Sequence, residues 1–227
     1  MSQLDDLIAT AHKLRAPGGC PWDAEQSHET LLTYLIEETY ELVDAVHSKD
    51  PNAIKEELGD VLYNVIFHSD IAEANGDFTI EDVAKYMEDK MKSRHPHVFG
   101  NEEEMKEFAA KTGDDVMKSW DNHKKKEKPE RESVLDGVPL GMPSLALANK
   151  VIGKAEKLGV LEKGQSPIQV NTDEELGTLL LAIVSAARAN GIDPEIALRK
   201  ATTELMSDIR KFEVLEASDA GVIGQEL

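Results

Sequence analysis

Four carboxylates in two neighbouring stretches are the residues of this sequence best suited to chemistry. Glu38 and Glu41 are three residues apart, and Glu57 and Asp60 repeat that spacing further along the chain. Residues at positions i and i+3 share one face of a helix, so each pair would present two carboxylates together. Carboxylate oxygens favour hard cations, Mg²⁺ or Mn²⁺ before Zn²⁺. We therefore expect the two pairs to bind a divalent cation.

The break between the two stretches should bring the pairs together. Asp50 is a suitable N-cap and Pro51 suits the first position of a helix, so one helix should end near Ser48 and the next should begin at Pro51. Such a short link favours an antiparallel pair of helices. At 1.5 Å per residue, the inner acid of each pair lies roughly 10 Å from the turn, with the outer acid one turn beyond. The four carboxylates should meet at one level of a helical hairpin.

Two of these acids fall inside apolar stripes, Glu38 on the first helix and Glu57 on the second. The stripes consist of Leu31, Leu35, Leu42 and Val46, and of Ile54, Leu58, Val61, Leu62 and Val65. A carboxylate on a core-facing stripe is costly unless its charge is compensated, and a bound cation is the simplest compensation. The alternative is an acidic face in solvent, which we favour only for Glu37 and Glu56.

The composition narrows the classes of protein that are compatible with this site. The chain has 227 residues, 41% of them hydrophobic, which is ample for a helical core. No clean alternation of apolar and polar residues predicts a strand, so the fold class is all-α. A net charge of −19 argues against binding a nucleic acid polymer, although a nucleotide can arrive with its own Mg²⁺.

Two further features predict a cytoplasmic protein that does not contact a membrane. No apolar run is long enough to span a bilayer, and the N-terminal residues do not resemble a signal peptide. The single cysteine, Cys20, excludes an internal disulfide and suits a reducing compartment.

Three regions are predicted along the chain: a helical domain over 1–132, a linker rich in Pro and Gly over 133–144, and a second helical block over 145–227. The second block contains a partial repeat, because residues 56–62 return as 174–180. Thr178 stands where the first copy has Asp60, and the preceding segment 164–170 reads as a loop instead of an acidic helix. We therefore expect the second copy to be non-catalytic.

The first domain should supply further elements around the acids. A helix is predicted over 3–15 and a loop over 16–23, where Trp22 either fills the core or contacts a ligand. Thr79 should cap a helix that carries Lys90 and Arg94 one turn apart. A metal site with two nearby cations suits a phosphate ester, because cations neutralise phosphate oxygens.

At this point the sequence resembles a known family. The runs Cys20-Pro21-Trp22-Asp23, Glu37-Glu38-x-x-Glu41, Glu57-x-x-Asp60 and Arg94-His95-Pro96-His97-Val98-Phe99 together look like those of MazG nucleoside triphosphate pyrophosphohydrolases. The resemblance covers most of 1–128 closely and 145–215 more weakly. It implies an all-α helical bundle of the MazG type with tandem repeats, and a homodimer. It also implies Mg²⁺-dependent hydrolysis of nucleoside triphosphates to NMP and pyrophosphate, by attack of metal-activated water on the α-phosphorus.

The resemblance further implies a role for each matching residue. The four paired acids would bind the metal, and Glu37 would help to orient water. Four later residues would contact the phosphates or close on the nucleotide: Lys90, Arg94, Trp120 and Lys124. In two-repeat members the C-terminal copy can be the active one, but here its acidic set is incomplete, so activity is expected in the N-terminal copy.

The sequence leaves two alternative functions. A non-enzymatic nucleotide-binding or regulatory module on the same fold is the main alternative, since one copy has already lost its acids. A ferritin-like di-iron bundle would need paired Glu-x-x-His motifs, and only Asp44-x-x-His47 comes near.

Overall fold

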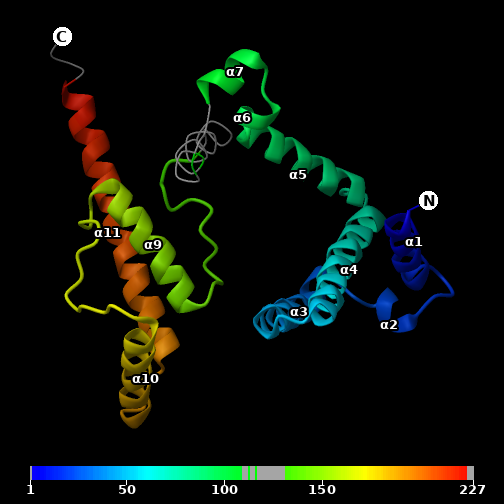
Figure 1. Cartoon of the computed structure of the whole chain (residues 1–227), viewed down its shortest axis with the longest axis horizontal. Helices are drawn as coiled ribbons and strands as arrows, with labels where there is room; N and C mark the ends of the chain where they lie inside the picture. Colours follow the sequence, from blue (N-terminus) through cyan, green and yellow to red (C-terminus); the bar gives the residue numbers. More distant parts are fainter. Residues whose placement is uncertain (1, 109–111, 113–115, 117–130, 224–227) are drawn as a thin grey trace. The chain divides into compact units, whose positions relative to one another are not determined.

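The computed structural model describes residues 2–108, 112, 116 and 131–223. Every regular element within these ranges is helical, which confirms the all-α prediction. The chain divides into two compact units, residues 1–124 and 125–227. Each unit is described by itself, with the helix labels of Figure 1.

The first unit is built around a long helical hairpin (Figure 1). Its helices are α1 (Gln3–Arg15), α2 (Pro21–Ala24), α3 (His28–Ser48), α4 (Pro51–Asn75), α5 (Ile80–Arg94), α6 (Pro96–Phe99) and α7 (Glu102–Glu107). Helices α3 and α4 pack against each other, and α1 packs on α4. The predicted antiparallel pair is therefore the scaffold of this unit.

The ends of α3 and α4 are defined by local chemistry, as predicted. The Asp50 carboxylate accepts a hydrogen bond of 2.9 Å from the backbone N–H of Asn52, and Pro51 occupies the first turn. At the far end, Gly76 adopts the left-handed conformation with φ 78°, which a glycine enters without steric cost. Thr79 and Asp82 form the predicted capping box of α5.

A partly buried ion pair fixes α1 to the second half of α4. Arg15 donates from Nη1 to Oδ2 of Asp70 at 2.6 Å, and Nδ1 of His12 lies 2.8 Å from the other oxygen of that carboxylate. The Arg15 guanidinium also lies over the Phe67 ring, 5.5 Å from its centroid. These contacts position the chain that leads from α1 to α2.

Two histidines meet where the start of α3 packs on α4. The Nδ1 atoms of His28 and His68 lie 2.8 Å apart, and the rings are parallel to within 7°. Nε2 of His68 is buried and has no hydrogen-bond partner in the described part of the chain. Burial, followed by the proximity of His28, lowers the pKa of His68 below its ordinary value.

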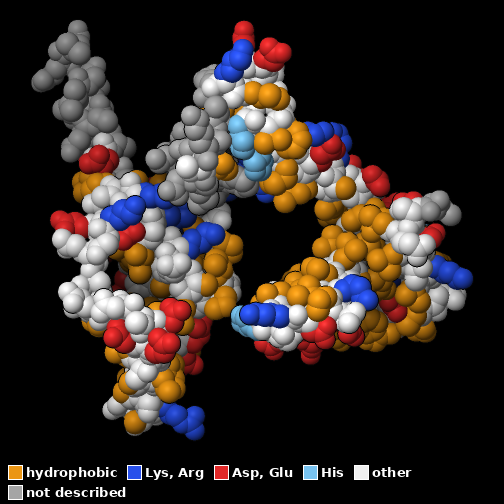
Figure 2. All heavy atoms as spheres, viewed as in Figure 1, with side chains coloured by type: hydrophobic (Ala, Val, Ile, Leu, Met, Phe, Trp, Pro, Cys, Tyr) orange, Lys and Arg blue, Asp and Glu red, His pale blue; other side chains and the backbone are white. Residues whose placement is uncertain are grey.

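Contrary to expectation, the apolar stripes of α3 and α4 are not buried throughout: several of their residues near the turn between the two helices are exposed. Leu31 is buried, but Val46, Leu58 and Leu62 are exposed in the single chain. Figure 2 shows hydrophobic side chains gathered over α3 and α4 on the face in view. The physical reason is that α1 covers only the second half of α4, through contacts near Asp70, which leaves the first half paired with α3 alone.

The second unit contains α9 (Ser144–Leu158), α10 (Asp173–Ala189) and α11 (Pro194–Ile223). Its core lies between α9 and α11 and includes Leu147, Val151 and Ile209. The segment 133–144, expected as a linker, contributes Leu135 and Val138 to this core. Helix α10 buries none of its residues in the single chain.

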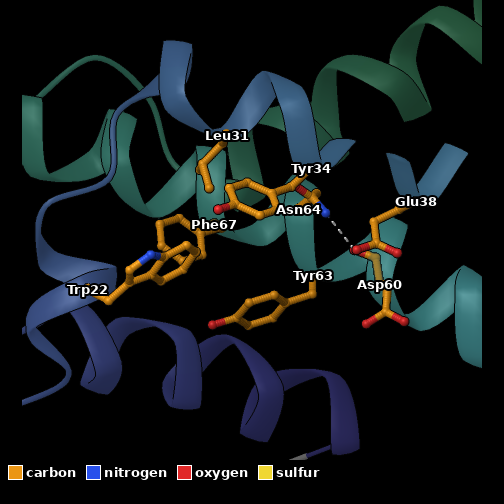
Figure 3. A pocket seen from close by; sticks show the side chains of 8 residues that line it. All are labelled: Trp22, Leu31, Tyr34, Glu38, Asp60, Tyr63, Asn64 and Phe67. Carbon is orange, nitrogen blue, oxygen red and sulfur yellow. Dashed lines mark hydrogen bonds between the residues drawn. The ribbon is translucent and has the colours of Figure 1, made fainter. Parts of the chain in front are cut away.

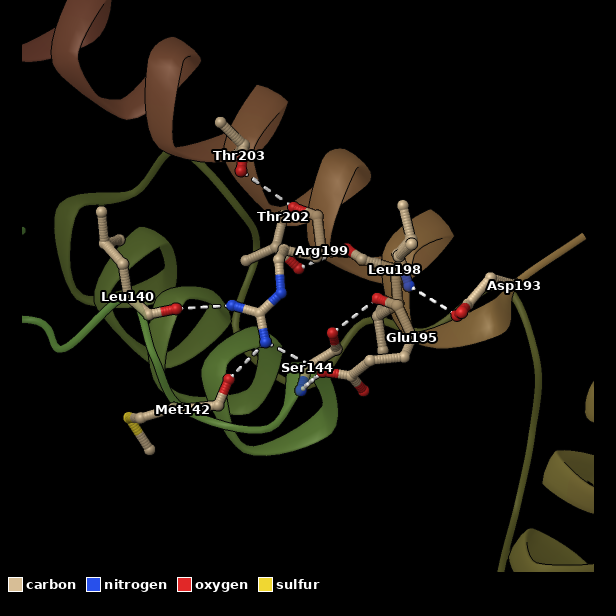
Figure 4. A network of polar contacts seen from close by, with 10 residues as sticks. Leu140, Met142, Ser144, Asp193, Glu195, Leu198, Arg199, Thr202 and Thr203 are labelled. Carbon is tan, nitrogen blue, oxygen red and sulfur yellow. Dashed lines mark hydrogen bonds and ion pairs between the residues drawn. The ribbon is translucent and has the colours of Figure 1, made fainter. Parts of the chain in front are cut away.

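Arg199 of α11 holds the chain that enters α9 (Figure 4). Its guanidinium donates to the carbonyl oxygens of Leu140 and Met142 and to the carboxylate of Glu195. That carboxylate also accepts a hydrogen bond of 2.9 Å from the backbone N–H of Ser144. The network satisfies backbone groups that would otherwise lack partners at the start of α9.

Within the described residues, no single helix is long and apolar enough to cross a membrane. Helices α10 and α11 meet the length and composition criteria only as a pair bent by 106°.

We predict that His68 makes stability depend on pH. Because the pKa of His68 is lowered in the folded state, the unfolded chain binds more protons than the folded chain at acidic pH. The contribution of His68 to the free energy of unfolding is therefore fully present above the unfolded pKa of 6.5 and is lost as the pH falls below it. Urea unfolding at pH 7.5 and 5.5 should show this loss, and His68→Phe should reduce it. His47→Gln, at an exposed position on α3, is the matched control. An unchanged pH dependence in His68→Phe would contradict this account.

Candidate active site

Three of the four predicted acids meet on the hairpin. Glu38 and Glu41 of α3 and Glu57 of α4 each offer a carboxylate oxygen, and these oxygens lie within 4.8 Å of one another. Glu38 and Glu57 are partly buried, whereas Glu41 is exposed. Since α3 and α4 are antiparallel and turn at Lys49, the i, i+3 spacing on each helix produces this convergence.

The acids raise one another's proton affinity. Partial burial, then the charges of Asp60, Glu41 and Glu57, raises the pKa of Glu38 above its ordinary value. Partial burial and the neighbouring carboxylates, Glu41 first, likewise raise the pKa of Glu57. An all-oxygen donor set with mutual repulsion fits a hard divalent cation such as Mg²⁺, which would neutralise it.

Asp60 does not belong to the group within 4.8 Å, but it shares a pocket with Glu38 (Figure 3). The pocket has a volume of about 140 Å³. Its lining consists of two carboxylates, one amide and five largely apolar side chains: Glu38, Asp60, Asn64, Trp22, Leu31, Tyr34, Tyr63 and Phe67. One end of the pocket is therefore acidic and the other aromatic. The aromatic end suits a flat ring system, and the acidic end suits an anionic group of the same ligand when a cation is bound between them.

The spacing of these residues follows the helical turn. From Glu38, Tyr34 lies one turn and Leu31 two turns back along α3. From Asp60, Asn64 lies one turn and Phe67 two turns forward along α4. Because the helices are antiparallel, the aromatic end of the pocket is formed by the first half of α3 and the second half of α4, away from the turn at Lys49.

The aromatic wall is completed by α2. The loop predicted over 16–23 contains this short helix, which begins at Pro21, a residue favoured at the first helical position. A Cβ on Gly19 would lie 2.3 Å from the carbonyl oxygen of Leu14, so the close approach of this segment to α1 requires glycine.

Two neighbouring residues on α2 serve the pocket in different ways. Trp22 is 48% exposed and packs edge-to-face with Tyr34 at 5.6 Å, so it lines the pocket instead of filling the core. Asp23 is buried, and its carboxylate accepts a hydrogen bond from the hydroxyl of Tyr63. Burial, then this carboxylate, raises the pKa of Tyr63.

Two of the predicted substrate-contacting residues, Lys90 and Arg94, are not brought to this pocket. Lys90 lies on α5 with its Nζ 5.7 Å from the centroid of the Tyr86 ring, and Arg94 is buried in the last turn of that helix. Neither lines the pocket. Glu37 is exposed beside Glu38, while Trp120 and Lys124 lie outside the described residues.

Apart from Trp22, the aromatic lining of the pocket was not predicted from the sequence, and neither was Asn64. The available signal was spacing, because Tyr34 and Asn64 each lie one turn from a predicted metal ligand. Gln26 donates a hydrogen bond to the carbonyl oxygen of Trp22 and accepts one from the Thr30 hydroxyl, which ties α2 to α3.

The second unit offers no equivalent acidic group among its described residues. Thr178 lies on α10, and the segment 164–170 before that helix is not helical, as predicted. Within the described ranges of the whole chain, the hairpin acids are the only set of three such groups close enough to share a metal ion.

Comparison with known proteins agrees with this geometry. The MazG nucleotide pyrophosphohydrolase domain matches residues 26–99, which include both acidic pairs. The chain is 38% identical to the nucleoside triphosphate pyrophosphohydrolase/pyrophosphatase MazG of Thermotoga maritima, over 98% of this chain and 90% of the relative. It is 33% identical to the Escherichia coli K12 nucleoside triphosphate pyrophosphohydrolase, over 96% and 90%.

A third relative, the nucleoside triphosphate pyrophosphohydrolase of Mycobacterium tuberculosis, is 39% identical over 92% of this chain and 57% of its own length. These matches extend well beyond the acidic motif and cover both units of the structure. The chain belongs to the MazG nucleotide pyrophosphohydrolase family.

Proposed function

We propose that this protein hydrolyses nucleoside triphosphates to NMP and pyrophosphate with Mg²⁺. The observation that carries the proposal is the junction of the acidic group with the aromatic pocket on one hairpin, in a chain of this family. The pocket suits a nucleoside, and the acids suit the cation that accompanies its phosphates. The net charge of −19 favours such a small substrate over a nucleic acid polymer.

In this proposal, Glu38, Glu41, Glu57 and Asp60 hold the cation. Bound Mg²⁺ would neutralise charge on the phosphate oxygens and make a nearby water more acidic. The carboxylates themselves cannot bind a triphosphate directly, because like charges repel. Their task is to fix the position of the cation relative to the aromatic end of the pocket.

The proposed reaction is a displacement at the α-phosphorus. The oxygen of water forms a bond to this phosphorus, the bond to the bridging oxygen breaks, and pyrophosphate leaves with that oxygen. Glu37 is the proposed group that orients the water and takes up its proton. Lys90 and Arg94 are the proposed phosphate contacts, since developing negative charge on the leaving group needs cations.

We further propose that the chain acts as a homodimer and that 145–227 is a non-catalytic repeat. Apolar residues of α3 and α4 near their turn are exposed in the single chain, and they support an interface there. Monomeric proteins rarely expose a large continuous apolar surface to water. Although α10 begins with three acids, no three acidic groups of the described second unit lie close enough to share a metal ion, which supports a structural role for the second copy.

The proposed function predicts the products of the reaction. ATP and other nucleoside triphosphates should give NMP and pyrophosphate when assayed with Mg²⁺. Glu38→Gln or Asp60→Asn should lower kcat by about 10²-fold or more, as expected when a group that stabilises charge is lost. Release of orthophosphate, or tight binding with no product over hours, would reject the proposal, and the second result would favour the regulatory module.

Two matched controls accompany this assay. Glu56→Gln removes an exposed acid beside Glu57 without touching the group of three. Thr178→Ala alters the corresponding position in the second copy. Both should retain nearly full activity, because neither residue belongs to the proposed site.

The proposed cation site also predicts how Mg²⁺ changes stability. Because the pKa of Glu57 is raised in the folded state, its ionisation opposes folding once the pH exceeds the unfolded value of 4.5. At pH 7 without metal, Glu57→Gln should therefore unfold at higher denaturant than the wild type. Mg²⁺ at about 100 times its Kd should stabilise the wild type by about 2.7 kcal/mol and the variant far less. An equal Mg²⁺ effect on both proteins would show that the cation binds elsewhere.

A further inference from the structure

We propose that Asn64 recognises the sugar of the nucleotide and makes the enzyme prefer ribonucleotides over deoxyribonucleotides. Its amide would hydrogen-bond the 2′-hydroxyl. This inference rests on the proposed function and names one determinant of its substrate class.

The position of Asn64 along α4 carries the argument. Measured along the helix axis, Asn64 lies about 6 Å and Phe67 about 10.5 Å beyond Asp60, at 1.5 Å per residue. A nucleotide has the same order: phosphates, then sugar, then base. With the phosphates at the acids and the base among Trp22, Leu31 and Phe67, the sugar lies beside Asn64.

The size of the pocket agrees with this placement. Its volume of about 140 Å³ is well below the roughly 300–1,000 Å³ of pockets that enclose a whole ligand. It therefore accommodates only part of a nucleotide. The triphosphate must extend outward over Glu38, Glu41 and Glu57, where it meets the cation.

The chemistry of the Asn64 side chain suits a hydroxyl. The residue is only 7% exposed, and its Nδ2 donates to the carbonyl oxygen of Asp60 at 3.1 Å (Figure 3). Because only the NH₂ group can donate to a carbonyl, this bond fixes which end of the amide is which. Oδ1 and the second N–H are then available, an acceptor and a donor that match a group able to both donate and accept.

The other polar groups of the pocket have different tasks. The Tyr63 hydroxyl donates to Asp23. The Tyr34 ring packs against Trp22 and extends toward the apolar end in Figure 3. Among the eight lining residues, this leaves the Asn64 amide as the uncharged polar group between the acids and the aromatic end.

The experiment measures kcat/KM for ATP against dATP and for GTP against dGTP. The wild type should prefer the ribonucleotide in both pairs. Asn64→Leu, of similar size, should lower this ratio about tenfold, the effect of losing one neutral hydrogen bond to a substrate hydroxyl. Asn52→Leu, the same change at an exposed position on α4, should leave the ratio unaltered.

The outcomes separate the two proposals. No NMP from the wild type would reject the proposed function itself. The role of Asn64 would be overturned if the active wild type showed no preference for ribonucleotides. It would also be overturned if Asn64→Leu lowered kcat/KM for the ribonucleotide and the deoxyribonucleotide by the same factor. If the leucine variant does not fold, Asn64→Ala and the affinities of non-hydrolysable α,β-methylene ATP and dATP provide the same comparison.

Discussion

Repulsion among carboxylates on one helical hairpin is the constraint on which the first unit depends. Glu38 and Glu57 are partly buried within reach of Glu41, and their pKa values are raised as a result. Such a group opposes folding at neutral pH unless a cation is bound. Despite this cost, the caps at Asp50 and Gly76 stabilise the ends of α4, and the ion pair at Asp70 holds α1 against that helix.

The aromatic pocket depends on the same hairpin but is closed by a different part of the chain. Helix α1 is anchored to α4, and the chain then turns tightly through Gly19 so that α2 reaches the pocket. Asp23 binds Tyr63 while its neighbour Trp22 forms the wall. The Cys-Pro-Trp-Asp run thus contains, in two neighbouring residues, a structural contact and a part of the pocket wall, although it lies far in sequence from Asp60.

Much of this arrangement could be predicted from the sequence because it is governed by local rules. Capping residues fixed the ends of α3, α4 and α5, and helical spacing predicted that the acids would converge. Burial could not be predicted in the same way. Leu58 and Leu62 are apolar yet exposed in the single chain, because periodicity identifies an apolar face without identifying what covers it. The pocket was missed because it depends on which residues of α2 reach α4, a tertiary contact that spacing does not encode.

The central claim is that water attacks the α-phosphorus at the first hairpin. It is tested most directly by hydrolysing ATP in ¹⁸O-labelled water with Mg²⁺ and locating the label by mass spectrometry. The account predicts one labelled oxygen in AMP and none in pyrophosphate, because the new bond forms at the α-phosphorus and the bridging oxygen leaves with pyrophosphate. Label in pyrophosphate, or in orthophosphate, would contradict it.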